Sequence, residues 1–398
     1  MRAVVLGSNA VLVLNAVQAL GALDIKSDVL SDWVLPRVRL SRSCRHYVRM
    51  PRGSLQTPTP ETWRWLSQYC FAQDVDVVIA ADLAAARAAV SPSAQGYDIP
   101  FFPLPSAEVL ELLHDKWTFY RLLCELGLPA PSTRLLTPDM PTRMLDLEPP
   151  VMVKPPASEG SDSVHKIDCL AALDALRAQP ANRDKSWLVQ EFIPGRDIDL
   201  SVLGAHGTLV AHTTQRDLAP GVKQFLQNDR MLEVGREIVR ATRLHGLAHF
   251  DMRIDERDQK LYVIECNPRI WGSLQYSVWA GVNFIEFGCR LTMGRPLPPF
   301  VPAVGDVSHQ GIAPVRLVKA LLGGRLAPPG MTGGTLASWR QALGDPLPEI
   351  LGHFTEGIEE RRRRAQLQPL AAATSLREVP LLHQAANDNA AAPRRRSL

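Results

Sequence analysis

An acid and an amide stand two residues apart at the end of an apolar stretch, VIECNPR, at residues 263–269. Because successive side chains of a strand point to opposite faces, Glu265 and Asn267 share one face and Cys266 points to the other. Asp251 belongs to an earlier predicted strand, and the polar turn ERDQ between the strands favours an antiparallel pair that brings Asp251 to the same face. Such oxygen ligands suit Mg²⁺. They equally suit a polar strand end that hydrogen-bonds to its neighbours, so spacing alone leaves both interpretations open.

A lysine stands at the end of a second apolar stretch, PVMVKP, at residues 150–155. The ammonium group of Lys154 is a point charge of the kind that contacts phosphate. The loop that follows is rich in serine and contains Gly160, and such small residues let backbone N–H groups approach phosphate oxygens closely. Taken by itself, this pattern is more typical of an ordinary polar loop than of a phosphate site.

The composition excludes several classes of protein. A net charge of +3, with basic residues scattered along the chain, argues against a nucleic-acid partner. No stretch is apolar for long enough to span a membrane. The six cysteines form no CxxC pair, so we expect neither a zinc site nor a disulfide framework, and free thiols favour the cytoplasm.

Alternating strand and helix signals predict an open α/β domain over residues 1–105, in which the single Gly7 argues against a dinucleotide site. An α+β domain is predicted over residues 106–295. It is expected to begin with one helix over residues 107–127. It also contains a predicted hairpin of strands 186–193 and 197–204.

The predicted α+β domain divides into a small subdomain (106–188) and a larger one that carries the acids (189–295). A proline-rich stretch then leads into a weakly patterned extension over residues 296–365. The alanine, asparagine, proline and arginine content of residues 366–398 predicts a disordered tail.

Five segments, taken together and in order, resemble the ATP-grasp superfamily, specifically its carboxylate–amine ligase and carbamoyl-phosphate-synthase-like branch. They are HDKW, VMVKPPASEGSDSV, VQEFIPGRDIDLSVLG, GLAHFDMRID and VIECNPRIWGSLQYSVWAGV. The resemblance covers about residues 1–295. It implies an α/β pre-ATP-grasp domain with an open sheet, followed by an α+β ATP-grasp domain.

The resemblance also implies how ATP is held. Lys116 and Lys154 would contact the phosphates, and a loop would close over them. The loop residues are Ser158, Glu159, Gly160 and Ser161. The backbone of a hinge strand would contact adenine through Glu191, Phe192 and Ile193. Asp197 stands where the family usually has a ribose-binding glutamate, which is one methylene longer.

The metal and the reacting groups follow from the same resemblance. Mg²⁺, with Mn²⁺ as a substitute, would be bound by Asp251, Glu265 and Asn267. Arg269 would hold the transferred phosphoryl group. His249 stands where related ligases often carry an arginine, and it can stabilise negative charge only when protonated. Arg253 would meet a substrate carboxylate.

The function implied is that of an ADP-forming ligase, which activates a small carboxylate as an acyl phosphate and couples it to an amine. Its partners would be small molecules, and a homodimer is expected. Two alternatives stay open: carboxyphosphate or carbamoyl-phosphate chemistry, and a non-catalytic ATP-binding protein with the same fold.

Overall fold

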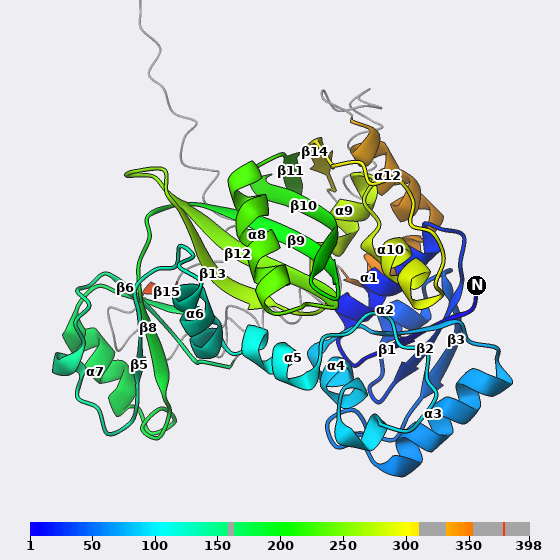
Figure 1. Ribbon diagram of the computed structural model, residues 1–398, viewed down its shortest axis with the longest axis horizontal. Helices are drawn as coiled ribbons and strands as arrows, with labels where there is room; N and C mark the ends of the chain where they lie inside the picture. Colours follow the sequence, from blue (N-terminus) through cyan, green and yellow to red (C-terminus); the bar gives the residue numbers. More distant parts are fainter. Residues whose placement is uncertain (158–162, 310–331, 353–376, 379–398) are drawn as a thin grey trace, which may run out of the picture.

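The computed structural model of the protein describes residues 1–157, 163–309, 332–352 and 377–378. It contains three sheets of mixed α/β architecture, and Figure 1 shows them side by side, with the largest sheet between the other two. Most of the candidate functional residues lie on two paired strands of the largest sheet, residues 246–255 and 261–267. The units of the other two sheets contribute segments that contact this strand pair or the residues after it.

The first sheet is parallel, with strand order β3-β2-β1-β4. Its inner strands are short and wholly apolar or buried, as expected where helices cover both faces of a parallel sheet. Its elements are β1 (Ala3–Leu6), α1 (Ala10–Gly21), β2 (Ser27–Ser31), α2 (Pro36–Arg39), β3 (Cys44–Arg49), α3 (Pro60–Ala72), β4 (Val77–Ala80), α4 (Leu83–Ala89) and the 3₁₀ helix η1 (Pro92–Ala94).

One buried acid in this sheet offers a test of its stability. Asp28 of β2 accepts two hydrogen bonds from Arg45, at 2.8 and 2.5 Å, and one from Tyr69 at 2.9 Å. Burial alone raises the pKa of Asp28, but these hydrogen bonds outweigh it and hold the pKa below its usual 3.8. The folded state therefore gains stability from this carboxylate above that pH, and loses it as the pH falls toward the lowered pKa.

We expect Asp28→Asn to lower the free energy of unfolding at pH 7 by about 2 kcal/mol, because the charge-assisted hydrogen bonds to Arg45 are lost. Urea unfolding at pH 7 and pH 3 measures this. The difference between wild type and variant should shrink at pH 3, because this pH lies below the usual pKa of 3.8 and the carboxylate of the unfolded wild-type chain is then largely protonated. An equal difference at both pH values would contradict the assignment.

The second unit has a small sheet with strand order β15-β7-β6-β8-β5. It holds α5 (Ala107–His114), α6 (Lys116–Glu125), β5 (Thr133–Leu136), the 3₁₀ helix η2 (Thr142–Met144), β6 (Val151–Lys154), β7 (His165–Ile167), α7 (Leu170–Ala178), β8 (Trp187–Glu191) and β15 (Arg377–Glu378). The single helix predicted over residues 107–127 is wrong. Asp115 is extended and caps a new helix by accepting from the amides of Trp117 and Thr118, so the chain breaks there.

The third unit is the largest sheet, with strand order β13-β12-β9-β10-β11-β14. Its elements are β9 (Gly195–Ala205), β10 (Thr208–Ala219), β11 (Val222–Leu226), α8 (Asp229–Ala241), β12 (Gly246–Asp255), β13 (Leu261–Asn267), α9 (Leu274–Trp279), α10 (Phe284–Thr292), β14 (Gly305–Ser308) and α12 (Gly333–Gly344). The predicted hairpin of residues 186–193 and 197–204 is wrong. Strand β8 pairs on both edges with β5 and β6, and β9 pairs with β10 and β12, so the two strands belong to different sheets.

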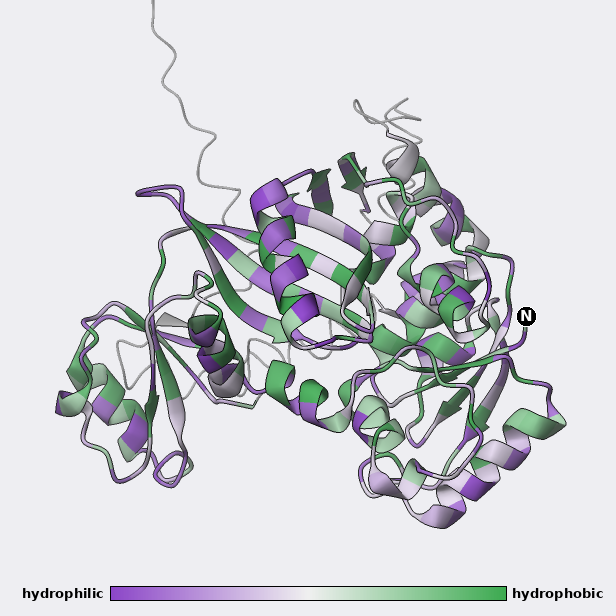
Figure 2. Ribbon diagram, viewed as in Figure 1, coloured by the Kyte–Doolittle hydropathy of each residue, from purple (hydrophilic) through white to green (hydrophobic). Residues whose placement is uncertain are grey.

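The two faces of the largest sheet differ in chemistry. One face packs against the amphipathic helix α8, whose apolar side includes Met231, Val234 and Ile238. In Figure 2 the outward side of α8 is hydrophilic, while hydrophobic residues alternate along the strands beneath it. The other face carries the polar residues of the candidate site and meets α9 and the first domain. The alternation of β9 and β12 therefore separates an apolar core from a polar face.

The first domain is joined to this polar face by direct hydrogen bonds. Asn15 of α1 donates to the carbonyl oxygens of Trp271 and Gly272, at 3.0 and 2.9 Å. Asn283 donates to the carbonyl of Ala19 at 2.8 Å. These buried amides hold the segment after β13 against α1.

The predicted domain boundaries stay predictions. The first sheet lies within residues 1–105, whereas β14 of the largest sheet falls in the predicted extension (296–365) and β15 of the small sheet falls in the predicted tail (366–398). Most of the predicted disordered tail, residues 366–398, lies outside the described residues. Within the described part of the chain, every helix is too short or too polar to cross a membrane.

Candidate functional site

The predicted acid and amide ligands meet where β12 and β13 pair. Asp251 lies opposite Glu265, and His249 lies opposite Asn267. Asn267 donates a hydrogen bond to Asp251 at 3.1 Å. Cys266 points to the other face and is buried in the apolar core. The three oxygen-bearing side chains therefore lie on one face, as alternation along the strand predicts.

Two buried lysines converge on Glu265 from other parts of the chain. Lys116 begins α6 and Lys154 ends β6, and their Nζ atoms lie 3.7 and 3.6 Å from Glu265 Oε2. Only 7% of Lys116 and 3% of Lys154 is exposed. A hydrogen bond from the amide of Lys116 to the carbonyl of Pro156 ties the start of α6 to the segment after β6.

The charges at this point shift one another's protonation. Burial alone raises the pKa of Glu265, but Lys154 and Lys116 outweigh it and lower the pKa. Burial lowers the pKa of Lys154, and Lys116 lowers it further, while Glu265 opposes both. Lys116, Lys154 and the nearby Arg269 bring three cationic side chains to the carboxylates of Glu265 and Asp251. This cluster suits a polyanionic ligand such as a phosphate chain.

Arg269 lies next to the predicted metal ligands. Its guanidinium group donates to the side-chain oxygen of Asn267 at 3.2 Å and to the carbonyl of Ile270 at 2.9 Å. These contacts aim the guanidinium along the face that carries Asp251 and Glu265. Arg269 therefore adds a further positive charge to the same site.

His249 is fixed on three sides. Its Nδ1 is 2.9 Å from the hydroxyl of Ser201, its Nε2 is 3.3 Å from Asp251, and its ring stacks on Trp271 at 5.3 Å between centroids. Burial alone lowers the pKa of His249, but the hydrogen bond and charge of Asp251 outweigh it and raise the pKa. The imidazole is thus held in one orientation beside a carboxylate.

Asp199 is a further candidate site residue that was not among those predicted from the sequence. Its carboxylate lies 4.0 Å from His249 Nε2, and ligand atoms of Asp199, His249 and Asp251 all lie within 4.8 Å of one another. Burial raises the pKa of Asp199 to about 6, against the opposing charge of His249. The signal was present in the segment DIDLS, because alternation places Asp197 and Asp199 on one face.

The predicted hinge lies between the small and the large sheet. The amide of Glu191 donates to Ser132 and that of Phe192 to Pro150, at 2.8 and 3.3 Å. In the part of the chain that the structure describes, the amide of Ile193 has no such hydrogen bond. Of the three predicted hinge amides, it is the one left to donate to a ligand.

Arg253, which the sequence predicted to meet a substrate carboxylate, contacts the hinge and Asp197 in this structure. Its guanidinium group donates to the carbonyls of Ile193 and Gly195, at 2.5 and 2.9 Å, and forms an ion pair with Asp197. This arrangement ties β12 to the hinge. It also engages the carboxylate of Asp197, the residue expected at the ribose. The predicted loop residues Ser158, Glu159, Gly160 and Ser161 lie outside the described residues.

One family of known proteins matches the part of the chain that carries Asp251, Glu265 and Asn267. The family described as "ATP-grasp in the biosynthetic pathway with Ter operon" matches residues 183–313, which include β9 to β13 and the metal-type ligands. This part of the chain is similar to ATP-grasp proteins. The resemblance of the five sequence segments is thereby confirmed.

Two curated proteins are similar to this chain over about half of its length. The D-aspartate ligase of Enterococcus faecium (strain Aus0004) is 25% identical over 214 residues, which is 46% of this chain and 51% of the relative. The arginine-specific large chain of carbamoyl phosphate synthase from Bacillus subtilis (strain 168) is 24% identical over 226 residues, which is 52% of this chain and 22% of the relative. The chain therefore spans about half or less of the length of these relatives.

A solved structure shares the ATP-grasp fold. It is the biotin carboxylase domain of 2-oxoglutarate carboxylase from Hydrogenobacter thermophilus, in complex with MgADP, ADP and bicarbonate. The TM-score is 0.57 at 15% sequence identity, and the match covers 77% of this chain and 73% of the other. At this identity the likeness concerns the fold alone.

Proposed function

We propose that this protein is an ATP-dependent, ADP-forming ligase that activates a small carboxylate as an acyl phosphate and couples it to an amine. The observation that carries the proposal is the convergence of Lys116 and Lys154 on Glu265, beside Asp251 and Asn267. Relatives such as the D-aspartate ligase of Enterococcus faecium support a carboxylate–amine reaction.

The residues fit a nucleotide and Mg²⁺. Asp251, Glu265 and Asn267 form a set of hard oxygen donors, and Mg²⁺ with such ligands usually takes the remainder from phosphates and water. A bound Mg²⁺ would neutralise phosphate charge and would leave the two lysines free to contact phosphate oxygens in place of Glu265. Mn²⁺ is expected to substitute. Adenine would be contacted by the amide of Ile193 at the hinge.

The chemistry needs alignment and charge neutralisation more than covalent work. A carboxylate is a poor electrophile because its leaving group would be oxide. Transfer of the γ-phosphoryl group of ATP creates an acyl phosphate, which an amine then attacks with release of phosphate. Lys116, Lys154 and Arg269 would hold anions that otherwise repel one another, and this positioning lowers the barrier.

His249 and Asp199 lie next to the proposed metal ligands, on the side toward β9 and β10. We place the carboxylate and the amine on this side. The orientation of His249, fixed by Ser201 and Trp271, suits contact with the reacting groups. Contact of Arg253 with a substrate carboxylate stays a prediction.

ADP release measured with Mg²⁺, candidate acids and candidate amines tests the proposal. We expect ADP release to rise only when an acid and an amine are both present, and ADP and phosphate to form in equal amounts. A non-catalytic ATP-binding protein would bind ATP yet release no ADP with any acid. That outcome, repeated over a broad panel of acids and amines, would overturn the proposal.

A second candidate function is carboxyphosphate chemistry, in which bicarbonate is the acid. It is favoured by the similarity to carbamoyl phosphate synthase and to a carboxylase structure that contains bicarbonate. ADP release stimulated by bicarbonate alone, without any organic acid, would select this alternative.

The proposal also includes a cellular location and an oligomeric state. All six cysteines lie outside disulfides, which favours a cytoplasmic location. A homodimer is also proposed, and sedimentation velocity of the full chain would test it.

A further inference from the structure

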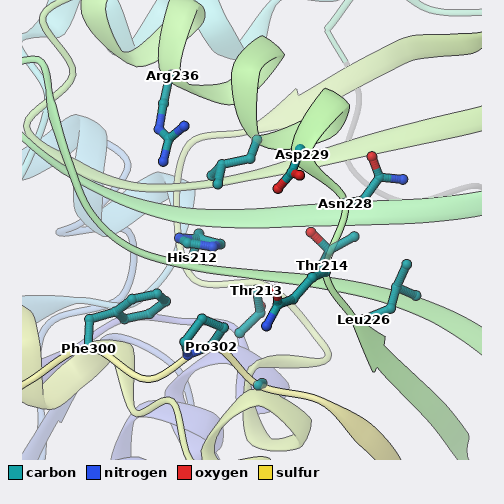
Figure 3. A pocket seen from close by; sticks show the side chains of 12 residues that line it. His212, Thr213, Thr214, Leu226, Asn228, Asp229, Arg236, Phe300 and Pro302 are labelled. Carbon is teal, nitrogen blue, oxygen red and sulfur yellow. The ribbon is translucent and has the colours of Figure 1, made fainter.

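A cavity of about 330 Å³ lies on the helical side of the largest sheet. Its walls come from β10, α8 and the segment around residues 300–303 (Figure 3). His212 and Thr214 line it from β10, Asp229 and Arg236 from α8, and Phe300 from the connecting segment. The volume falls within the range of pockets that bind small molecules.

This cavity is separate from the proposed ATP site. Thr214 pairs with Leu200, and Leu200 packs toward Gly235 of α8, so both side chains face the helix. Asp199 and the neighbouring Gln215 point to the opposite, polar face, because faces alternate along a strand. The cavity and the predicted metal ligands therefore lie on opposite sides of the sheet.

Two opposite charges line the cavity without an ion pair. Neither Asp229 nor Arg236 forms a salt bridge with another residue in the described ranges. The two residues are seven positions apart on α8, two helical turns, so their backbones are separated by about 10 Å along the helix. In Figure 3 both side chains point from α8 toward the cavity. Charges held apart in this way suit a ligand that carries both signs.

Two rings and several aliphatic side chains also line the cavity, beside polar groups such as Thr214 and Asn228. The ring of His212 lies 4.6 Å from that of Phe300, between centroids, and Leu232 and Pro302 complete this part of the wall. Burial and the charge of Arg236 lower the pKa of His212, so its ring is neutral at pH 7. A neutral imidazole beside a phenyl ring favours a planar apolar body over another charge.

We propose that this cavity is a second ligand site, distinct from the ATP site, for a small zwitterion with a flat apolar body. The carboxylate of the ligand pairs with Arg236, and its ammonium group pairs with Asp229. The body lies against His212 and Phe300. This proposal is independent of the ligase activity.

Isothermal titration of the full chain with three matched probes tests the site. The probes are 4-(aminomethyl)benzoate, benzoate and benzylamine, which differ only in the charged groups on one ring. We expect the zwitterion to bind at least about tenfold more tightly than either single-charge probe, since each charge-assisted contact contributes to affinity. Saturating MgADP should leave the zwitterion's affinity unchanged, because the two sites lie on opposite faces.

Three variants identify the contacts. Arg236→Ala should reduce the affinity for 4-(aminomethyl)benzoate to that for benzylamine, and Asp229→Asn should reduce it to that for benzoate. Arg240→Ala is the matched control, because Arg240 lies on the same helix and pairs with Glu237 outside the cavity. All three changes are at exposed positions, so thermal unfolding should match wild type.

The proposal is overturned if the three probes bind equally, or if none binds at millimolar concentration. It is also overturned if Arg240→Ala weakens binding as much as Arg236→Ala does. Displacement of the zwitterion by MgADP would assign the binding to the ATP site and would likewise refute a second site.

Discussion

Glu265→Gln is expected to reduce Mg²⁺-dependent ADP formation by at least about a hundredfold, which corresponds to roughly 2.7 kcal/mol of transition-state stabilisation. The substitution keeps the size of the side chain but removes the charge of a proposed metal ligand. It also leaves Lys116 and Lys154 without the carboxylate that lies 3.7 and 3.6 Å from them. The measurement is ADP release at varied Mg²⁺, with the acid and amine that give the highest wild-type rate.

Loss of the carboxylate also affects folding, so the activity needs controls. Glu265 is the partly exposed partner of two buried lysines, and removing one partner of such a pair is destabilising, so Glu265→Gln should lower the melting temperature. Glu265→Asp keeps the charge one methylene further back and should fold like wild type, with an intermediate rate. Glu256→Gln changes an exposed acid in the β12–β13 turn and should behave as wild type. Full activity in Glu265→Gln would contradict the metal assignment.

Gly288→Val is expected to lower the free energy of unfolding by about 3 kcal/mol, because the added side chain has no room. A Cβ atom at Gly288 of α10 would lie 2.0 Å from two atoms of the Phe102 ring, which is itself only 3% exposed. Phe102 belongs to the core that the first domain shares with α10, so the ring cannot turn into solvent. The helix must instead shift away from the first domain. Urea unfolding measures the effect.

A matched glycine separates crowding from a general effect of adding a side chain. Gly333 begins α12, and a Cβ atom built there meets no atom within 4 Å. Gly333→Ala should leave the unfolding midpoint unchanged or raise it slightly, since alanine favours a helix. If Gly288→Val unfolded at the wild-type urea concentration, the close packing between α10 and Phe102 would not hold the domains together.

The parts of the site that the sequence predicted depend on local periodicity. Alternation in VIECNPR placed Glu265 and Asn267 together, and the short turn between β12 and β13 brought Asp251 opposite Glu265. Both inferences need only neighbours along the chain or across one turn. The same rule applied to β9 would have revealed Asp199.

Predictions of which strands pair, and of where a helix ends, were less reliable. The hairpin of residues 186–193 and 197–204 is wrong because each strand finds its partners in a different sheet. The helix over residues 107–127 is wrong because the side chain of Asp115 satisfies two amides better than a continued helix would. Periodicity does not reveal which edge of a strand will be paired, or when a capping residue will end a helix.

By itself, the sequence determined the mixed α/β class, the ATP-grasp resemblance and the shared face of Asp251, Glu265 and Asn267. Each of these follows from a local pattern or a motif. Only the tertiary structure decided that Lys116 and Lys154 meet at Glu265, that Arg253 is engaged by Asp197 and the hinge, and that Asp199 joins His249. The physical reason is that these contacts join separate strands and helices. Their distances depend on how whole sheets pack, and no spacing along the chain encodes that packing.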